Sequence, residues 1–359
     1  LGGNDDDEGN ALAVDPAGNV YLAGQTFSDD FPTANAYSDQ CTAGEGFCMG
    51  DAFLAKLTPT GDTLTYGTYL GGNEPDDAMG VAVNETGLAY LTGTTMSKNF
   101  PTVLPFQEDL KGWTNAYISK VDTQQTGMNS LIYSTYLGGS DSDFGTAIKL
   151  ASNDQPVIVG QTTSDDFPVQ SPLQNMNKGN SDAFIASLDI ASNTLIYSTY
   201  LGGTDQEFAY GVTTNAQGDA YVIGTTQSTD FPTLNAVQSD NGGKIDTFIT
   251  GIMYDGSAWL LSTYMGGSEA DYGYGITLDE NGAIYITGAT HSADFPVNNE
   301  FQAYAGNGDA FVAKITPGTP GTLDYSTLLG GENADLGTSI AVDNMGNSFI
   351  TGITLSADF

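Results

Sequence analysis

A short phrase, Tyr-Leu-Gly-Gly or a close variant, recurs along the whole chain and limits the possible folds more than any other feature. A fixed period of this length is typical of a chain built from similar structural units, each of which packs on its neighbours. The leucine or methionine of the phrase stands at six positions, 64 to 69 residues apart: Leu1, Leu70, Leu137, Leu201, Met265 and Leu329. The repeat units are therefore residues 1–69, 70–136, 137–200, 201–264, 265–328 and the partial unit 329–359.

Four short β-strands are predicted in each complete unit, and no unit shows the 3.6-residue period of an amphipathic helix. Three of these strands are clear in the first unit, at residues 11–14, 20–24 and 51–56, and the fourth is clearest at residues 195–200. A turn that starts with Asp or Asn and contains Gly joins the first two strands, as at residues 15–19. Each unit is therefore predicted to form one antiparallel sheet.

The inner strands of these sheets are apolar on both faces, so each sheet needs a neighbour on either side. Radially packed sheets of this kind are the blades of a β-propeller. We therefore predict an all-β fold, a single β-propeller domain over residues 1–359 with five complete blades and one half blade, closed as a six-bladed ring. The alternatives are a β-helix, which needs shorter coils, and tandem sandwiches, which need about seven strands per domain.

Several motifs recur together in these units. They include Tyr-Ser-Thr-Tyr-Leu-Gly-Gly at 133–139, Thr-Thr-Ser-Asp-Asp-Phe-Pro at 162–168, Asp-Ala-Phe-Val-Ala-Lys at 309–314 and the Asp-x-x-Gly-Asn turn. In these motifs the chain resembles, over essentially its whole length, the bacterial β-propeller repeat called SBBP. The resemblance implies a secreted or surface-attached bacterial protein and carries over no catalytic residues. The name of the family implies seven blades, whereas this chain supplies five and a half.

The sixth unit supplies only two predicted strands, at residues 339–342 and 347–351. An exposed strand edge carries unpaired N–H and C=O groups, so we expect two further strands to complete this blade. Residues before Leu1, residues after Phe359 or a neighbouring subunit could supply them, and the last source would build a polymer by strand addition. Because the chain begins without methionine, we expect it to be part of a longer protein.

The chain carries 44 Asp and Glu against 8 Lys and no Arg, which gives a formal net charge of −36. Proteins bind polyanions through cationic side chains, so this composition argues against nucleic acid and anionic membranes as partners. No apolar run approaches the ~20 residues that cross a bilayer, so membrane insertion is not expected. The expected partner is neutral, cationic or metallic.

Cys41 and Cys48 lie in one Gly-rich loop and are the only cysteines of the chain. They predict a disulfide, and with it an oxidising compartment outside the cytoplasm. A pair of free thiols is the alternative interpretation.

Acidic residues follow each Leu-Gly-Gly phrase in two registers that are two residues apart. Two such acids in an irregular loop could bind calcium, which prefers oxygen ligands. The other interpretation is that these acids accept hydrogen bonds from the backbone amides of the Gly-Gly turn or pair with the strand lysines Lys56, Lys120 and Lys314. The candidate calcium ligands are Asp5, Asp7, Asp141, Asp143, Asp205, Glu207, Glu269 and Asp271. Calcium is the one cofactor that the sequence suggests.

A second recurring motif is Thr-x-Ser-x-Asp/Asn-Phe, which could present aromatic rings to a glycan but is more typical of packing between adjacent blades. Its phenylalanines are Phe31, Phe100, Phe167, Phe231, Phe295 and Phe359. His291 is the only histidine, so neither a Ser-His-Asp triad nor a histidine zinc site is expected. The Cys41 loop and an insertion around Trp113 depart from the repeat without evident chemistry.

These features together predict a non-catalytic β-propeller located outside the cell or on its surface. We expect it to be a structural or adhesive module that could assemble into a larger polymer through its incomplete blade. The alternatives are a module that binds calcium or carbohydrate and, third, a polysaccharide-active enzyme with paired carboxylates.

Overall fold

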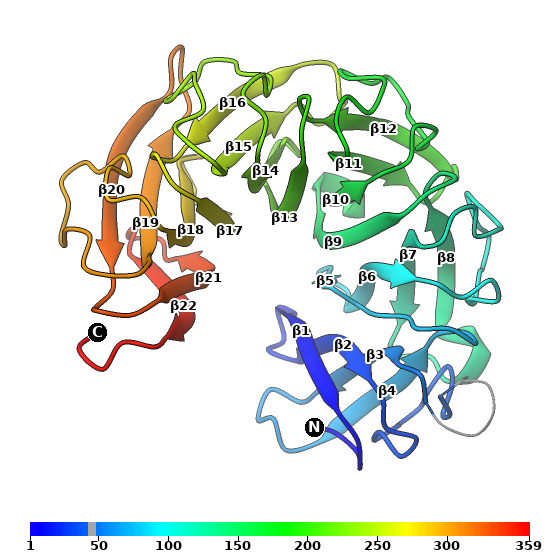
Figure 1. Ribbon diagram of the computed structural model, residues 1–359. Helices are drawn as coiled ribbons and strands as arrows, with labels where there is room; N and C mark the ends of the chain where they lie inside the picture. The colour runs from blue at the N-terminus through cyan, green and yellow to red at the C-terminus, as the bar shows by residue number, and fades with distance from the viewer. Residues whose placement is uncertain (42–47) are drawn as a thin grey trace. The chain divides into compact units, whose positions relative to one another are not determined.

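The computed structural model describes residues 1–41 and 48–359 (Figure 1). Its regular elements are β-strands, apart from the short 3₁₀ turns η2 (Gly127–Asn129) and η3 (Ser152–Asp154), and the described residues contain no α-helix. No helix in the described part of the chain is therefore long and apolar enough to span a membrane.

The strands form five four-stranded sheets and one two-stranded sheet, which we call blades 1 to 6 in chain order. Blade 1 contains β1 (Asp7–Val14), β2 (Val20–Thr26), β3 (Asp51–Leu57) and β4 (Leu64–Leu70), and blade 2 contains β5 (Gly80–Val83), β6 (Leu88–Thr95), β7 (Asn115–Asp122) and β8 (Leu131–Leu137). Blade 3 contains β9 (Asp143–Leu150), β10 (Pro156–Thr162), β11 (Asp182–Asp189) and β12 (Thr194–Leu201). Blade 4 contains β13 (Glu207–Thr214), β14 (Ala220–Thr226), β15 (Asp246–Ile252) and β16 (Trp259–Met265). Blade 5 contains β17 (Asp271–Leu278), β18 (Ile284–Thr290), β19 (Asp309–Thr316) and β20 (Thr322–Leu329), and blade 6 contains β21 (Asp335–Val342) and β22 (Ser348–Thr354).

Neighbouring strands within each blade are consecutive in the chain and antiparallel. The predicted all-β fold, with five complete four-stranded blades and one half blade, is therefore confirmed. The six-bladed ring stays a prediction.

The chain divides into two compact units. The first contains residues Leu1–Pro168 and Ala186–Ile196, and the second contains Val169–Ile185 and Tyr197–Phe359. Blades 1 and 2 thus belong to the first unit, and blades 4, 5 and 6 belong to the second. Each unit has its own apolar core.

In the first unit, Tyr21 and Leu54 of blade 1 share a buried cluster with Leu91 and Tyr117 of blade 2. In the second unit, a similar cluster joins Ile249 of blade 4 to residues of blade 5 such as Ile286 and Phe311. The blades therefore cover one another's apolar faces, as the two-faced hydrophobicity of the inner strands predicts.

Tight turns between the first two strands follow the predicted pattern. In blade 5, Oδ1 of Asp279 accepts hydrogen bonds from the N–H groups of Asn281 and Ala283, both at 2.9 Å. Gly282 supplies the positive φ of 82° that this turn needs. Asp15, Asn84, Asn215 and Asp343 accept the same pair of hydrogen bonds in their own blades.

The first strand of a blade begins earlier than predicted. Strand β1 starts at Asp7, four residues before the predicted start at Ala11. The prediction is late because a β-bulge between Gly9 and Ala11 interrupts the alternation of side chains that marks a strand in the sequence. Blades 4, 5 and 6 carry the same bulge. The later acid of each loop thus belongs to a strand, except in blade 2, where Asp76 forms an isolated bridge with Thr95.

A glycine of the second strand lies against the backbone at this bulge. A Cβ added at Gly288 would collide with the backbone oxygen of Tyr272, and Gly24, Gly224 and Gly352 lie in the same position. A residue with a side chain would force the first two strands apart.

We expect Gly288→Ala to lower the free energy of unfolding by about 3 kcal/mol, the upper end for overpacking. The matched control is Gly282→Ala, at a turn with positive φ and open space around it, which should cost about 1 kcal/mol. Urea denaturation of both variants measures the difference, and equal losses would contradict the argument.

Candidate functional site

The later acid of each loop is the centre of a recurring hydrogen-bond network, which we call the acid clamp. In blade 5, Oδ2 of Asp271 accepts hydrogen bonds from the N–H of Gly267 at 2.6 Å and from Oγ of Ser292 at 2.8 Å. Its Oδ1 accepts a hydrogen bond from the hydroxyl of Thr290. The clamp thus joins the Gly-Gly turn, the first strand and the Thr-x-Ser motif.

The bond from the second glycine recurs in the other blades. The threonine bond to the second carboxylate oxygen recurs only in blades 3 and 4, because Oδ1 of the acid has no partner among the described residues of blades 1, 2 and 6. The second glycine of each phrase donates to the acid over 2.6 to 2.9 Å: Gly3 to Asp7, Gly72 to Asp76, Gly139 to Asp143, Gly203 to Glu207 and Gly331 to Asp335. All of these acids except Asp7, which is half-buried, are buried. This geometry agrees with the interpretation in which the Gly-Gly amides satisfy the carboxylate.

Acids of the earlier register point elsewhere. The backbone N–H of Glu269 donates to Oγ of Ser292 at 2.9 Å, while its side chain is exposed and forms an ion pair with Lys244. Asp5, Asp141 and Asp205 are likewise exposed and use their N–H groups in the same way.

The structure therefore separates the two registers of candidate calcium ligands, one buried in the clamp and one exposed. Within residues 1–41 and 48–359, the single group of three acids or cysteines whose ligand atoms lie within 4.8 Å of one another is Cys41, Cys48 and Asp51. Its two cysteines are joined in a disulfide. The geometry identifies no calcium site at Asp5, Asp7, Asp141, Asp143, Asp205, Glu207, Glu269 or Asp271.

Lysines of the third strands do not pair with the clamp acids. Lys56, Lys120 and Lys314 each lie 4.9 Å from the ring centroid of a tyrosine in the neighbouring strand. Lys314 also lies 3.5 Å from the turn residue Asp279. The interpretation in which these lysines neutralise the loop acids is therefore wrong, because their side chains run along the blade instead.

A second carboxylate faces the clamp from the preceding blade. Asp246 begins β15 of blade 4, and a Cβ added at Gly266 would lie 2.5 Å from its Oδ1 and 2.9 Å from Oδ2 of Asp271. The buried Oδ1 of Asp246 has no hydrogen-bond partner. The same arrangement pairs Asp51 with Asp76, Asp182 with Glu207 and Asp309 with Asp335.

Between blades 2 and 3, an amide takes the place of the facing acid. Asn115 begins β7, and its Nδ2 donates to Oδ2 of Asp143 at 3.1 Å, in the position that Oδ1 of Asp246 takes next to Asp271. Its Oδ1 accepts hydrogen bonds from Gln107 and Lys111, as Oδ2 of Asp246 does from Gln238 and Gly242. The amide of Asn115 therefore donates a hydrogen bond to the facing carboxylate, whereas the facing carboxylates of Asp246 and Asp271 repel each other and leave Oδ1 of Asp246 without a donor.

Burial raises the pKa of several of these acids. It raises the pKa of Asp76 and of Asp182 to about 7, and the nearby charges of Asp51 and Glu207, respectively, add to the effect. Burial, with a smaller contribution from Asp271, raises the pKa of Asp246 to about 6. Burial also raises the pKa of Asp143 to about 6. These carboxyls thus favour their neutral form in the fold.

We expect the melting temperature to rise as the pH falls from about 8 to about 5. The folded pKa values of about 6 to 7 lie above the ordinary value of 3.8, so the folded chain holds these protons more tightly than the unfolded chain. The stability that they contribute is complete below the unfolded pKa and is lost as the pH rises through the folded pKa. Calorimetric scans across this range measure the slope, and a flat profile would contradict the expectation.

Two reciprocal substitutions isolate the acid pair. Asp246→Asn places an amide opposite the clamp acid, as Asn115 does, and should stabilise the fold by about 1–3 kcal/mol near pH 8 with little change near pH 5. Asn115→Asp creates a further acid pair beside Asp143 and should destabilise the fold near pH 8. The same scans measure both variants, and the idea fails if the two shifts have the same sign.

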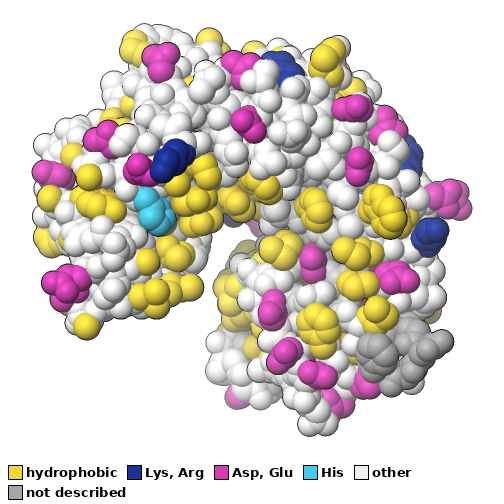
Figure 2. All heavy atoms as spheres, viewed as in Figure 1, with side chains coloured by type: hydrophobic (Ala, Val, Ile, Leu, Met, Phe, Trp, Pro, Cys, Tyr) yellow, Lys and Arg dark blue, Asp and Glu magenta, His cyan; other side chains and the backbone are white. Residues whose placement is uncertain are grey.

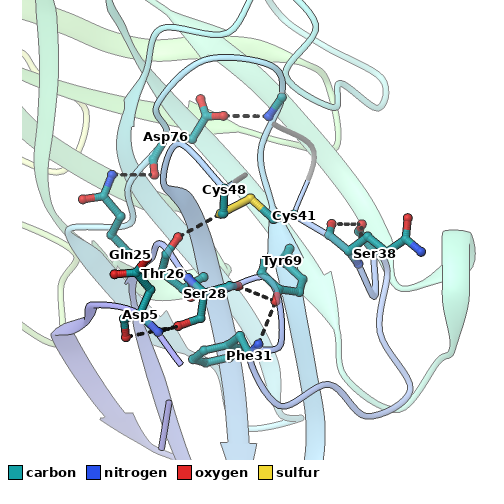
Figure 3. The surroundings of a disulfide bond; sticks show 12 residues. Asp5, Gln25, Thr26, Ser28, Phe31, Ser38, Cys41, Cys48, Tyr69 and Asp76 are labelled. Atoms are coloured by element: carbon teal, nitrogen blue, oxygen red, sulfur yellow. Dashed lines mark hydrogen bonds between the residues drawn. A yellow bond between two sulfur atoms is a disulfide. The ribbon is translucent and has the colours of Figure 1, made fainter. Parts of the chain in front are cut away.

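The structure joins Cys41 and Cys48 in a disulfide, beside the end of β2 in blade 1 (Figure 3). Sγ of Cys48 lies 3.3 Å from the backbone oxygen of Thr26. The interior of this loop, at residues 42–47, lies outside the described residues. The disulfide therefore lies next to the blade 1 clamp, whose Ser28 appears in Figure 3 together with Asp5, the exposed acid whose N–H donates to Oγ of Ser28.

Phenylalanines of the recurring motif are core residues rather than exposed platforms. Phe31 packs with its ring centroid 4.5 Å from that of Phe53, and its N–H donates to the hydroxyl of Tyr69 at 2.8 Å (Figure 3). Phe53 and Tyr69 belong to the same blade as Phe31. In blades 2 and 5, Phe100 and Phe295 belong to the buried clusters that join each blade to its neighbour, as the prediction of packing between blades requires. The exception is Phe359, which is 67% exposed.

Sequence reasoning did not assign a role to one groove of the first unit. Its volume is about 830 Å³, and its lining includes Met96, Lys98, Asn99, Lys111 and Trp113. The Trp113 side chain is 81% exposed. Trp113 stands two residues before the third strand of its blade, where blades 3, 4 and 5 have the polar residues Asn180, Lys244 and Asn307. A large aromatic residue at a position that is polar in those blades is the sequence signal that could have revealed the groove.

The family model described as SBBP, beta-propeller repeat, matches residues 1–32, 262–296 and 324–359. These matches agree with the blades of the structure and with the resemblance in the sequence. Three regions of the chain are thus similar to the SBBP β-propeller repeat, and they support an SBBP-type β-propeller repeat protein.

Regulatory protein FlaEY of Caulobacter vibrioides is 25% identical to this chain over 375 residues. The match covers 99% of this chain and 37% of FlaEY, so the chain spans little more than a third of that relative.

Two solved structures are similar over most of the chain. One, described as the extracellular domain of a one-component system from B. thetaiotaomicron, is 11% identical with a TM-score of 0.39 and covers 98% of this chain and 40% of that one. The other, a mutant apocarotenoid oxygenase of Synechocystis, is 12% identical with a TM-score of 0.38 and covers 97% of this chain and 80% of that one. At these scores neither structure bears on the function of this chain.

Proposed function

We propose that this chain is a non-catalytic module, displayed outside the cell or on its surface, that acts as a structural and adhesive scaffold. The observation that carries the proposal is the acid clamp. A catalytic carboxylate pair should break the repeat, whereas the later acid of every unit is tied to its own Gly-Gly turn. Carboxylates that hold the fold together in this way are not free to act on a substrate.

The surface supports the same proposal. Acidic side chains are spread over the visible face and few lysines accompany them (Figure 2). Such a charge keeps proteins apart in dilute solution, and salt or divalent ions reduce the repulsion. The disulfide of Cys41 and Cys48 suits an oxidising compartment.

The test is a gene deletion in the bacterium that produces the chain, with adhesion of the cells to a polysaccharide-coated surface as the readout. Deletion should reduce adhesion, and wild-type protein and the variant Glu207→Gln should restore it equally, because Gln can still accept the hydrogen bond from Gly203. A panel of polysaccharides should show no release of reducing ends. Turnover that Glu207→Gln abolishes would overturn the non-catalytic role.

The half blade supports a second candidate function, assembly by strand addition. Ile340 of β21 packs on Tyr285 and Val312 of blade 5, whereas Phe349 and Ile353 of β22 are 61% and 57% exposed. Two added strands would pair with the outer edge of β22 and extend the apolar face on which Phe349 and Ile353 lie. Another copy of the chain, or other residues of a longer protein, could supply them.

We expect the chain of residues 1–359 to associate as its concentration rises. Light scattering after gel filtration measures the mass, and the double variant Phe349→Lys, Ile353→Lys should stay monomeric because like charges at the edge oppose pairing. A matched control, Leu12→Lys with Val14→Lys, alters two exposed apolar residues of blade 1 and should leave association unchanged. A wild-type chain that is monomeric at every concentration would contradict assembly by the isolated chain.

A further inference from the structure

The positions at which blade 2 departs from the repeat come together in one groove. The Thr-x-Ser-x-Asp/Asn-Phe motif has Lys98 and Asn99 where the first and third units have two aspartates, Asp29 and Asp30, and Asp165 and Asp166. Trp113 stands where other units have small or polar residues or Met49. The groove is lined by Lys98, Asn99 and Trp113 together with Asn73, Glu74 and Lys111.

These departures change the chemistry of the groove in one direction. The two acids of the first and third units become a lysine and an amide, and Lys111, whose charge also acts on Asp166, adds a second ammonium group. The lining therefore carries two lysines against one acid, Glu74, on a chain with a net charge of −36. Trp113 adds a broad aromatic ring that is 81% exposed. A large exposed aromatic side chain beside polar groups is typical of a binding surface rather than of a folded core.

The groove is held in shape by the backbone around it. Gly112 lies against the backbone of Asp141, where a Cβ would collide, and the N–H of Lys111 donates to Oδ1 of Asn115 at 3.0 Å. On the opposite side, Oδ1 of Asn99 accepts a hydrogen bond from the N–H of Asn73 at 2.9 Å. A preformed wall loses little conformational entropy when a ligand binds.

Resting on the adhesive role proposed above, we infer that this groove binds a pyranose sugar that carries a carboxylate, as one acidic residue within an otherwise neutral glycan. The ring of Trp113 stacks on the apolar face of the sugar. Lys98 and Lys111 pair with its carboxylate, and Asn73 and Glu74 bind its hydroxyl groups. The volume of about 830 Å³ suits a ligand of a few sugar units.

A single carboxylate also fits the charge of the whole chain. A polyanionic glycan would be repelled by the surrounding acids, whereas one acidic sugar meets the two lysines within the groove. The Debye length of about 8 Å at physiological salt limits the repulsion from more distant acids.

The test titrates the full chain with two matched probes, a neutral glucose tetrasaccharide and the same tetrasaccharide with one glucuronate. Calorimetry and the fluorescence of Trp113 follow binding. The acidic probe should bind at least about tenfold more tightly than the neutral one. Trp113→Ala should lose binding of both probes, while the half-buried Trp259 and the melting temperature report that the variant is folded.

Lys98→Asp with Asn99→Asp restores the residues that other units use, so the fold should be kept. This variant should lose the preference for the acidic probe and still bind the neutral one within about threefold of wild type. Asn180→Ala, at the position of Trp113 in blade 3, is the matched control and should change nothing. Failure of the wild type to bind either probe, equal binding by Trp113→Ala, or a preference that survives the double substitution would overturn the inference. Because cell adhesion is measured separately, such a failure leaves the scaffold role standing or falling on its own assay.

Discussion

A carboxylate at the start of each blade, buried in every blade except the first, is the group on which this repeat depends. A buried acid needs donors for its oxygens, and here they come from the second glycine of the phrase and from hydroxyls of the Thr-x-Ser motif. These groups lie more than twenty residues apart in the chain, so they must recur together in every unit. The clamp therefore explains why the sequence repeats its polar residues as faithfully as its apolar ones.

The blades and their turns follow from the sequence, whereas the roles of the acids do not. Asp141 and Asp143 are two residues apart in the chain, yet the side chain of Asp141 is exposed and that of Asp143 is buried. The boundary between them is the start of β9, and a bulge later in that strand hides this start from the alternation of side chains. The pairing of Asp246 with Asp271 depends on how two blades pack, which no local pattern encodes.

A motif also needs its surroundings. Phe295 and Phe359 occupy the same position of the repeat, but Phe295 is 3% exposed and Phe359 is 67% exposed. Phe295 packs on Phe311 of the third strand of its blade, with ring centroids 4.8 Å apart. Blade 6 has no third strand in the described chain, so the same side chain has nothing to pack against. The sequence could identify these phenylalanines as a set but could not show which of them is covered.

Repetition makes departures easier to interpret. Because the clamp and the apolar clusters stabilise each blade, exposed loop residues can change without loss of the fold, as the side chains at the position of Trp113 do from unit to unit. A single unusual residue there would mean little, because exposed side chains vary freely. Lys98 and Asn99 precede Trp113 by 15 and 14 residues, yet all three line one groove. Residues that differ from the repeat at separate positions of the sequence, but meet in one groove, distinguish a site from ordinary surface variation.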